Sequence, residues 1–253
     1  MNQNKYFKNY IVYYYIMMNT ALYNTLTRGI SGGGTRSTQT INALIHSKKD
    51  LLVATFANLI AQLGITYYVM THTTLEKEKD HTTLKLQFIG LFIFQLILVG
   101  YIITPMESWK RLLCFSVFSV SYGLMLSYLT LFISPDIIKM ALLGTGAIFA
   151  SMFSIGLMLL LSGIQLGYKW GLFLFFSLLF YIVFQIFAHF YTVPITYKTI
   201  LTIGIVLFSL YVIYDTNQIL QRNYNGDFVT ASIDYYLDII NIFTKLTFYL
   251  SDN

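Results

Sequence analysis

Two aspartates near the end of the sequence stand within or beside strongly apolar runs. Asp215 follows the uncharged run Thr199–Tyr214, and Asp238 lies inside the largely apolar run Ala231–Leu250. A carboxylate at membrane depth is costly, so it is expected to face a partner or a water-filled cavity and to have a function. Asp215 and Asp238 are therefore the first candidates for a functional pair.

The chemistry of such a pair follows from its electrostatics. Two carboxylates that meet at low dielectric cannot both ionise cheaply, so they share a proton and respond to pH near neutrality. When both are deprotonated, their oxygens can bind a hard cation such as Ca²⁺, which would then compete with protons. The alternative is structural: Asp215 caps the end of its helix, and Asp238 pairs with Lys245 or Asn241.

A polar stripe accompanies Asp238 if its segment is a helix. At 100° per residue, four polar side chains fall within about 60° of one another: Asp234, Asp238, Asn241 and Lys245. In lipid this stripe is expected to face the interior of a bundle, where it would assist the acid pair. On the preceding segment, Gly204 shares a face with Asp215 and predicts the close approach of another helix backbone.

The composition indicates which elements must position these residues. Of 253 residues, 56% are hydrophobic and 11% are charged, whereas a soluble domain has roughly 45–50% and 25%. The chain has three prolines and lacks the ~10-residue alternating segments of a β-barrel, so long helices are favoured. We predict an all-α, polytopic membrane protein.

Seven apolar segments follow one another along the chain. They are Leu51–Leu75, Leu86–Met106, Leu112–Pro135, Met140–Tyr168, Trp170–Tyr197, Thr199–Tyr214 and Ala231–Leu250. The first five exceed the ~20 residues that cross ~30 Å of hydrocarbon. The sixth is interrupted by Asp215 and is expected to continue as helix to about Gln221, while full crossing by the seventh stays open. We assign residues 1–50 to a cytosolic, partly flexible or interfacial tail, 51–250 to the bundle and 251–253 to a C-terminal tail.

The basic residues predict the orientation. Ten lie in the N-terminal tail and the even-numbered loops, and five lie in the odd-numbered loops (Lys77, Lys79, Lys85, Lys139 and Lys198). This excess places the N-terminus in the cytosol. The net charge of +5 is spread over segment ends without a basic stripe or binding motif, so we expect contact with anionic lipid headgroups and not with nucleic acid.

Three other functions fit the sequence less well. A retinal protein could use Lys245, but Leu112–Pro135 offers no carboxylate as counter-ion. A hydrolase needs several metal ligands or a nucleophile with a base, and His189 is the only histidine that lies well away from the ends of an apolar segment. A coupled transporter would show interrupted helices in two matching halves, which this chain lacks. We therefore expect no enzymatic activity and no organic cofactor.

Two stretches resemble a known family. Phe208-Ser-Leu-Tyr-Val-Ile-Tyr-Asp-Thr-Asn-Gln-Ile219, followed by Tyr236-Leu-Asp-Ile-Ile-Asn-Ile-Phe243, is similar to the C-terminal signature of the transmembrane BAX inhibitor motif family. That family includes the Bax inhibitor, Lifeguard and Golgi anti-apoptotic proteins. The resemblance implies a seven-helix transmembrane bundle with a central C-terminal helix.

The same resemblance implies a function. It implies a pH-sensitive Ca²⁺ leak through intracellular membranes, with Ca²⁺ as the transported ion, and suppression of cell death. The family's aspartate pair falls on Asp215 and Asp238, as pH sensor, gate and Ca²⁺ ligands. The membrane would be that of the Golgi or endoplasmic reticulum in a eukaryotic or viral setting, with the plasma membrane as alternative. A non-conducting protein that regulates cell death by binding other membrane proteins is the main rival.

The sequence departs from the family in two respects. In bacterial relatives an arginine after the second helix latches one aspartate, whereas the aligned stretch here reads Thr104-Pro-Met-Glu-Ser-Trp-Lys-Arg111. Lys110, Arg111 or Arg222 are the candidates to replace that latch. Asp234 adds a third acid beside the pair, where relatives usually have a small or polar residue.

Overall fold

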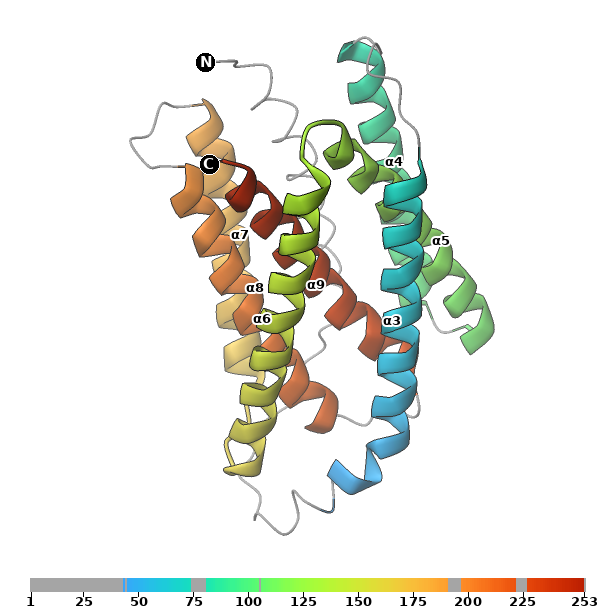
Figure 1. Cartoon of the computed structure of the whole chain (residues 1–253). Coiled ribbons are helices and arrows are strands. Elements are labelled where there is room, and N and C mark those ends of the chain that lie inside the picture. The colour runs from blue at the N-terminus through green and yellow to red at the C-terminus, as the bar shows by residue number, and fades with distance from the viewer. Residues whose placement is uncertain are drawn as a thin grey trace.

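The computed structural model describes residues 43, 45–73, 81–104, 106–190, 197–221 and 227–252. All regular structure within these ranges is helical (Figure 1). The elements are α3 (Lys49–His72), α4 (His81–Ile103), α5 (Ser108–Ser127), the 3₁₀ helix η1 (Tyr128–Leu131), α6 (Pro135–Leu161), α7 (Tyr168–Phe190), α8 (Tyr197–Gln221) and α9 (Phe228–Ser251). Most of the expected N-terminal tail and Arg222 lie outside the described residues.

Five of these helical stretches are long and apolar enough to cross a membrane: α3, α5 with η1, α6, α7 and α8. α4 contributes a shorter apolar stretch, Ile89–Ile102, and α9 carries two aspartates and a lysine. The chain is thus a multi-pass membrane protein whose described regular structure is all helical, and the count of seven spans stays a prediction. The expectation that the sixth segment continues past Asp215 to Gln221 is confirmed by α8.

α9 lies inside the bundle. Of its 24 residues, 18 are buried, and it packs against α3, α5, α6 and α8. Figure 1 shows it crossing the bundle diagonally behind α6. Because α9 carries polar and charged side chains that lipid would not solvate, the interior is the favourable place for it.

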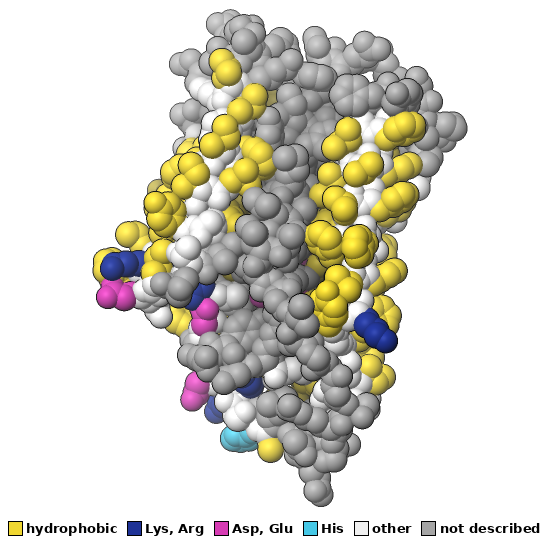
Figure 2. Space-filling view, turned by 180° about the vertical axis from the view of Figure 1, so that it is seen from behind, with side chains coloured by type: hydrophobic (Ala, Val, Ile, Leu, Met, Phe, Trp, Pro, Cys, Tyr) yellow, Lys and Arg dark blue, Asp and Glu magenta, His cyan; other side chains and the backbone are white. Residues whose placement is uncertain are grey.

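The outer helices present apolar side chains instead. Leu143 on α6 and Phe180 on α7 are 75% and 71% exposed, as expected where lipid is the solvent. Figure 2 shows hydrophobic side chains along both flanks of one face, and the charged side chains that it colours lie in the lower half of that face. This distribution fits a bundle whose sides contact hydrocarbon and whose ends reach the headgroups.

Candidate functional site

The polar stripe predicted on α9 is buried along its whole length, and we call it the acidic face. It consists of Asp234, Asp238, Asn241 and Lys245, with Asp234 6% exposed and the other three at 0%. The Lys245 ammonium donates a hydrogen bond to Asn241 Oδ1 at 3.1 Å. Asn241 in turn donates to the Leu237 carbonyl at 2.9 Å, which fixes its amide.

The acidic face lies toward α8, as two contacts show. The Tyr235 hydroxyl donates to Thr216 Oγ1 at 3.1 Å, and the Lys245 ammonium sits 4.3 Å from the centroid of the Phe208 ring. Asp238 lies between these two contacts along α9. The helices therefore run in opposite directions, and the acidic face meets the part of α8 that precedes Thr216.

Asp215 lies next to Thr216 on α8 and is 3% exposed. Asp234 and Asp238 on α9 are buried as well, and α8 and α9 pack against each other. The structure therefore buries three carboxylates on two neighbouring helices.

Tyr235 and Thr216 are residues that the sequence reasoning missed. The Tyr235 ring stacks on Phe56 with centroids 5.9 Å apart and meets Phe149 edge-on at 5.3 Å, while its hydroxyl reaches Thr216. A buried tyrosine commonly needs such a partner for its hydroxyl. The available signal was its position in the sequence between Asp234 and Asp238.

Gly204 lies against two side chains of neighbouring helices. A Cβ atom at this position would overlap with the Lys245 side chain of α9 and with the Tyr181 hydroxyl of α7. The glycine therefore makes room for a lysine stem and a phenol. The reason is that Lys245 is long enough to cross the interface and lie over α8.

The candidate latch residues are placed differently from one another. Lys110 is half exposed and pairs with Glu107 at 3.2 Å. Arg111 at the start of α5 donates to Asp227 Oδ2 at 2.6 Å, and also to Thr230 Oγ1 at 2.5 Å and the Ile102 carbonyl at 2.8 Å. Asp227 is the N-cap of α9 and accepts from the Thr230 amide. Arg111 thus ties the start of α9 to α4 and α5.

A second polar region, which we call the neutral seam, lies where α9 meets α3 and α5. Its residues are Thr55, Asn58, Gln62 and Thr66 on α3, Ser119 on α5, and Ser232 and Tyr236 on α9, all buried. Ser232 donates to the Thr55 carbonyl at 3.0 Å. The hydroxyls of Thr66 and Tyr236 are 2.6 Å apart, and Thr66 also donates to the Ser119 carbonyl at 3.1 Å.

Among the residues that the structure describes, no group of three or more His, Cys, Asp or Glu side chains is arranged to hold a metal ion. Ca²⁺ takes 6–8 oxygen ligands when it is held firmly. The carboxylates of Asp215 and Asp238 alone provide fewer.

Two comparisons with known proteins bear on this site. The family model Bax1-I, described as inhibitor of apoptosis-promoting Bax1, matches residues 48–253. A comparison with curated proteins found no match. The matched region contains all of α3–α9, including both faces of α9 and the partner residues on α8.

Proposed function

Because the chain belongs to the Bax inhibitor family of membrane proteins, we propose that it is a Ca²⁺ leak channel gated by Asp215 and Asp238. The observation that carries this proposal is the burial of Asp215 on α8 and of Asp234 and Asp238 on α9, two helices that pack against each other. Buried acids in membrane helices mark ion and proton paths more often than structural contacts.

The proposed mechanism uses the shared ionisation of the pair. With a proton on the pair, charge repulsion between α8 and α9 is relieved and the carboxylates offer few ligands to a cation. With both acids ionised, their oxygens attract Ca²⁺ and repel each other across the interface. The protonation state therefore sets how α8 and α9 pack and how readily Ca²⁺ passes.

A Ca²⁺-flux assay in liposomes tests the proposal. Reconstituted wild-type protein is expected to pass Ca²⁺ at a rate that changes across about pH 6 to 8, where a perturbed carboxylate titrates. Asp215→Asn and Asp238→Asn should each flatten that dependence. Asp136→Asn is the matched control, because Asp136 at the start of α6 is a surface carboxylate with an 89% exposed side chain.

The outcomes separate the channel from its rival. If both buried-aspartate variants follow the wild-type pH profile, the gating role of the pair is wrong. If wild-type protein passes no Ca²⁺ in pure lipid at any of these pH values but captures membrane proteins from cells, the chain is an interaction protein of the cell-death pathway. The Asp136→Asn variant should behave as wild type in either case.

We also propose that the protein acts in the Golgi or endoplasmic reticulum membrane, where a leak would lower stored Ca²⁺ and thereby suppress cell death. Expression in cells is expected to reduce the Ca²⁺ that an ionophore releases from these stores. Asp238→Asn should not reduce it to the same level. Stores of unchanged content, with the protein present in those membranes, would contradict this location and role.

A further inference from the structure

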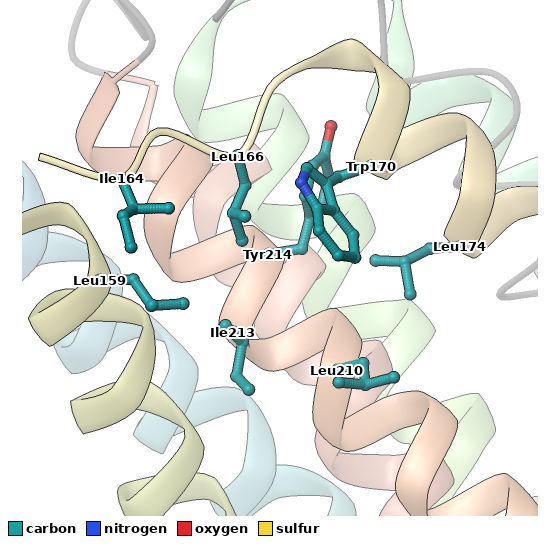
Figure 3. A pocket seen from close by; sticks show the side chains of 8 residues that line it. All are labelled: Leu159, Ile164, Leu166, Trp170, Leu174, Leu210, Ile213 and Tyr214. Carbon is teal, nitrogen blue, oxygen red and sulfur yellow. The ribbon is translucent and has the colours of Figure 1, made fainter. Parts of the chain in front are cut away.

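The end of α6 folds back in a well-defined turn. Gly163 has a positive φ of 84°, its amide donates to the Leu160 carbonyl, and the Ile164 amide donates to the Leu159 carbonyl, both at 2.9 Å. This is a Schellman motif, which normally brings together the two apolar side chains that flank it. In this turn they are Leu159 and Ile164, and both line a cavity beside α8 (Figure 3).

Amide side chains of α8 hold the segment after this turn. Asn217 Oδ1 accepts from the Leu166 amide at 2.8 Å, and Asn217 Nδ2 donates to the Ile164 carbonyl at 3.1 Å. Gln218 donates to the Leu166 carbonyl. The wall of the cavity between α6 and α7 is therefore fixed by hydrogen bonds, so the cavity is preformed.

The cavity has a volume of about 290 Å³ and lies between the end of α6, the start of α7 and α8. Figure 3 shows the side chains of Trp170 and Tyr214 at one end of the cavity, with Leu210 and Ile213 along α8. A Cβ atom at position 171 would lie 3.1 Å from Tyr214 Cζ, so Gly171 leaves room for that ring. The volume is at the lower limit for ligand pockets, and the lining is almost entirely apolar.

The cavity opens toward the lipid-facing surface. Ile164, Trp170 and Leu210 are 49%, 53% and 41% exposed, so its rim continues into the outer face of the bundle. Lys169, which precedes Trp170, is exposed and belongs to the cytosolic end by the distribution of basic residues. An apolar slot beside an interfacial tryptophan and a lysine matches the chemistry of a phospholipid whose headgroup is anionic.

We propose that this cavity binds one acyl chain of an anionic phospholipid from the cytosolic leaflet, with the headgroup phosphate beside Lys169. The chain would lie against Leu159, Leu210 and Ile213, and the headgroup would lie at the level of Trp170. This site requires no Ca²⁺ conduction, so it stands or falls independently of the proposed channel activity.

The two tryptophans of the sequence provide the test. Trp109→Phe leaves Trp170 at the cavity as the only tryptophan, and Trp170→Phe leaves Trp109. Trp109 is a matched control for Trp170, because it lies in the first turn of α5, is 60% exposed and has the Lys110 amine 5.4 Å from its ring. Unlike Trp170, it does not line the cavity. The probe is brominated phosphatidylglycerol, at a small fraction of phosphatidylcholine vesicles.

At equal lipid composition, the brominated lipid is expected to quench Trp170 at least about twofold more than Trp109, because the seated chain is enriched over the bulk lipid. Unlabelled phosphatidylglycerol should reverse the excess. In the Trp109→Phe background, Leu210→Phe fills the cavity and should remove the excess. Val206→Phe should not, because Val206 is one turn earlier on the same lipid-facing side of α8 and is 54% exposed.

Other outcomes would overturn the inference. Equal quenching of Trp170 and Trp109 means that the cavity holds no chain beyond ordinary annular lipid. An excess that Leu210→Phe leaves intact means that the lipid binds elsewhere near Trp170. If brominated phosphatidylcholine gives the same excess, or Lys169→Gln does not reduce the preference for phosphatidylglycerol, the headgroup assignment is wrong.

Discussion

Tyr235 and Tyr236 are neighbours on α9 and both are fully buried, yet their hydroxyl groups belong to different polar regions. The Tyr235 hydroxyl binds Thr216 of α8, which follows Asp215 in the sequence. The Tyr236 hydroxyl binds Thr66 of α3, in the neutral seam. One helix thus separates a region of ionisable groups from a region of uncharged ones.

The difference shows how a membrane protein can use polar residues in two ways. In the neutral seam, hydroxyl and amide groups connect α3, α5 and α9 by hydrogen bonds between helices, and such bonds are a common means of holding helices together in lipid. On the acidic face the groups can change charge. Stability measurements should therefore respond to both faces, whereas the pH response of Ca²⁺ flux should respond only to the acidic face.

The largest loss of stability is expected from Arg111→Gln. Arg111 holds the start of α9, so its loss should disturb both the acidic face and the neutral seam. The side chains of Arg111 and Asp227 are only 12% and 30% exposed, and hydrogen bonds to charged groups contribute about 1.5–3 kcal/mol each. A loss of about 3 kcal/mol in unfolding free energy is expected from thermal unfolding in detergent. Lys110→Gln is the control; its exposed pair with Glu107 should contribute about 0–1 kcal/mol, and equal losses would contradict the role of Arg111.

Gly204→Ala is expected to have the next largest effect, because the added methyl group overlaps with Lys245 and Tyr181. Overpacking of this kind costs about 1–3 kcal/mol, and we expect a lower unfolding temperature and altered flux. Gly146→Ala is the control, since a Cβ atom there has no atom within 4 Å. A Gly204→Ala protein as stable as Gly146→Ala would mean that Lys245 does not lie over α8.

Lys245→Met should move the pH midpoint of Ca²⁺ flux upward. Removing a positive charge from the acidic face favours the protonated acids, so they keep their proton to higher pH. A shift of about one pH unit corresponds to about 1.4 kcal/mol of lost interaction. Lys198→Met, which removes a lysine that lies over Tyr249, serves as control, and an unmoved midpoint for Lys245→Met would show that this lysine does not act on the pair.

The smallest change in stability is expected from replacing either of the adjacent tyrosines, and this pair compares the two faces of α9 most directly. Tyr235→Phe and Tyr236→Phe each remove one buried hydroxyl, and each should lower the unfolding free energy by about 1 kcal/mol. Only Tyr235→Phe should move the pH midpoint of flux, because its hydroxyl binds Thr216, the neighbour of Asp215 on α8, whereas the Tyr236 hydroxyl binds Thr66 on α3. If Tyr236→Phe moves the midpoint by as much, the two faces of α9 are not functionally separate.

Much of the fold could be predicted from the sequence, because each membrane-spanning helix needs an apolar segment long enough to cross the hydrocarbon layer. The continuation of α8 to Gln221 followed from the same pattern, although Asp215 interrupts the run. Helical arithmetic also placed Lys245 beside Asn241 on one face, and their side chains are hydrogen-bonded. These are relations within single segments, for which local geometry suffices.

Relations between segments could not be predicted in this way. Arg111 and Asp227 are 116 positions apart, and nothing local indicates that they meet. The role of Gly204 depended on which neighbour reaches α8. The neutral seam was present as a spacing of polar residues from Thr55 to Thr66, but uncharged polar residues are common in membrane helices and gave only a weak signal.

The central position of α9 has a consequence for biosynthesis. Chains are made from the N-terminus at about 5–20 residues per second, so α3, α5, α6 and α8 are inserted before the helix that they surround exists. Until α9 arrives, polar groups such as Thr66 and Asp215 lack the surface that covers them in the finished bundle. The order of synthesis therefore leaves the core incomplete until α9 has been made, and a ribosome that stalls before α9 would leave an intermediate open to membrane quality control.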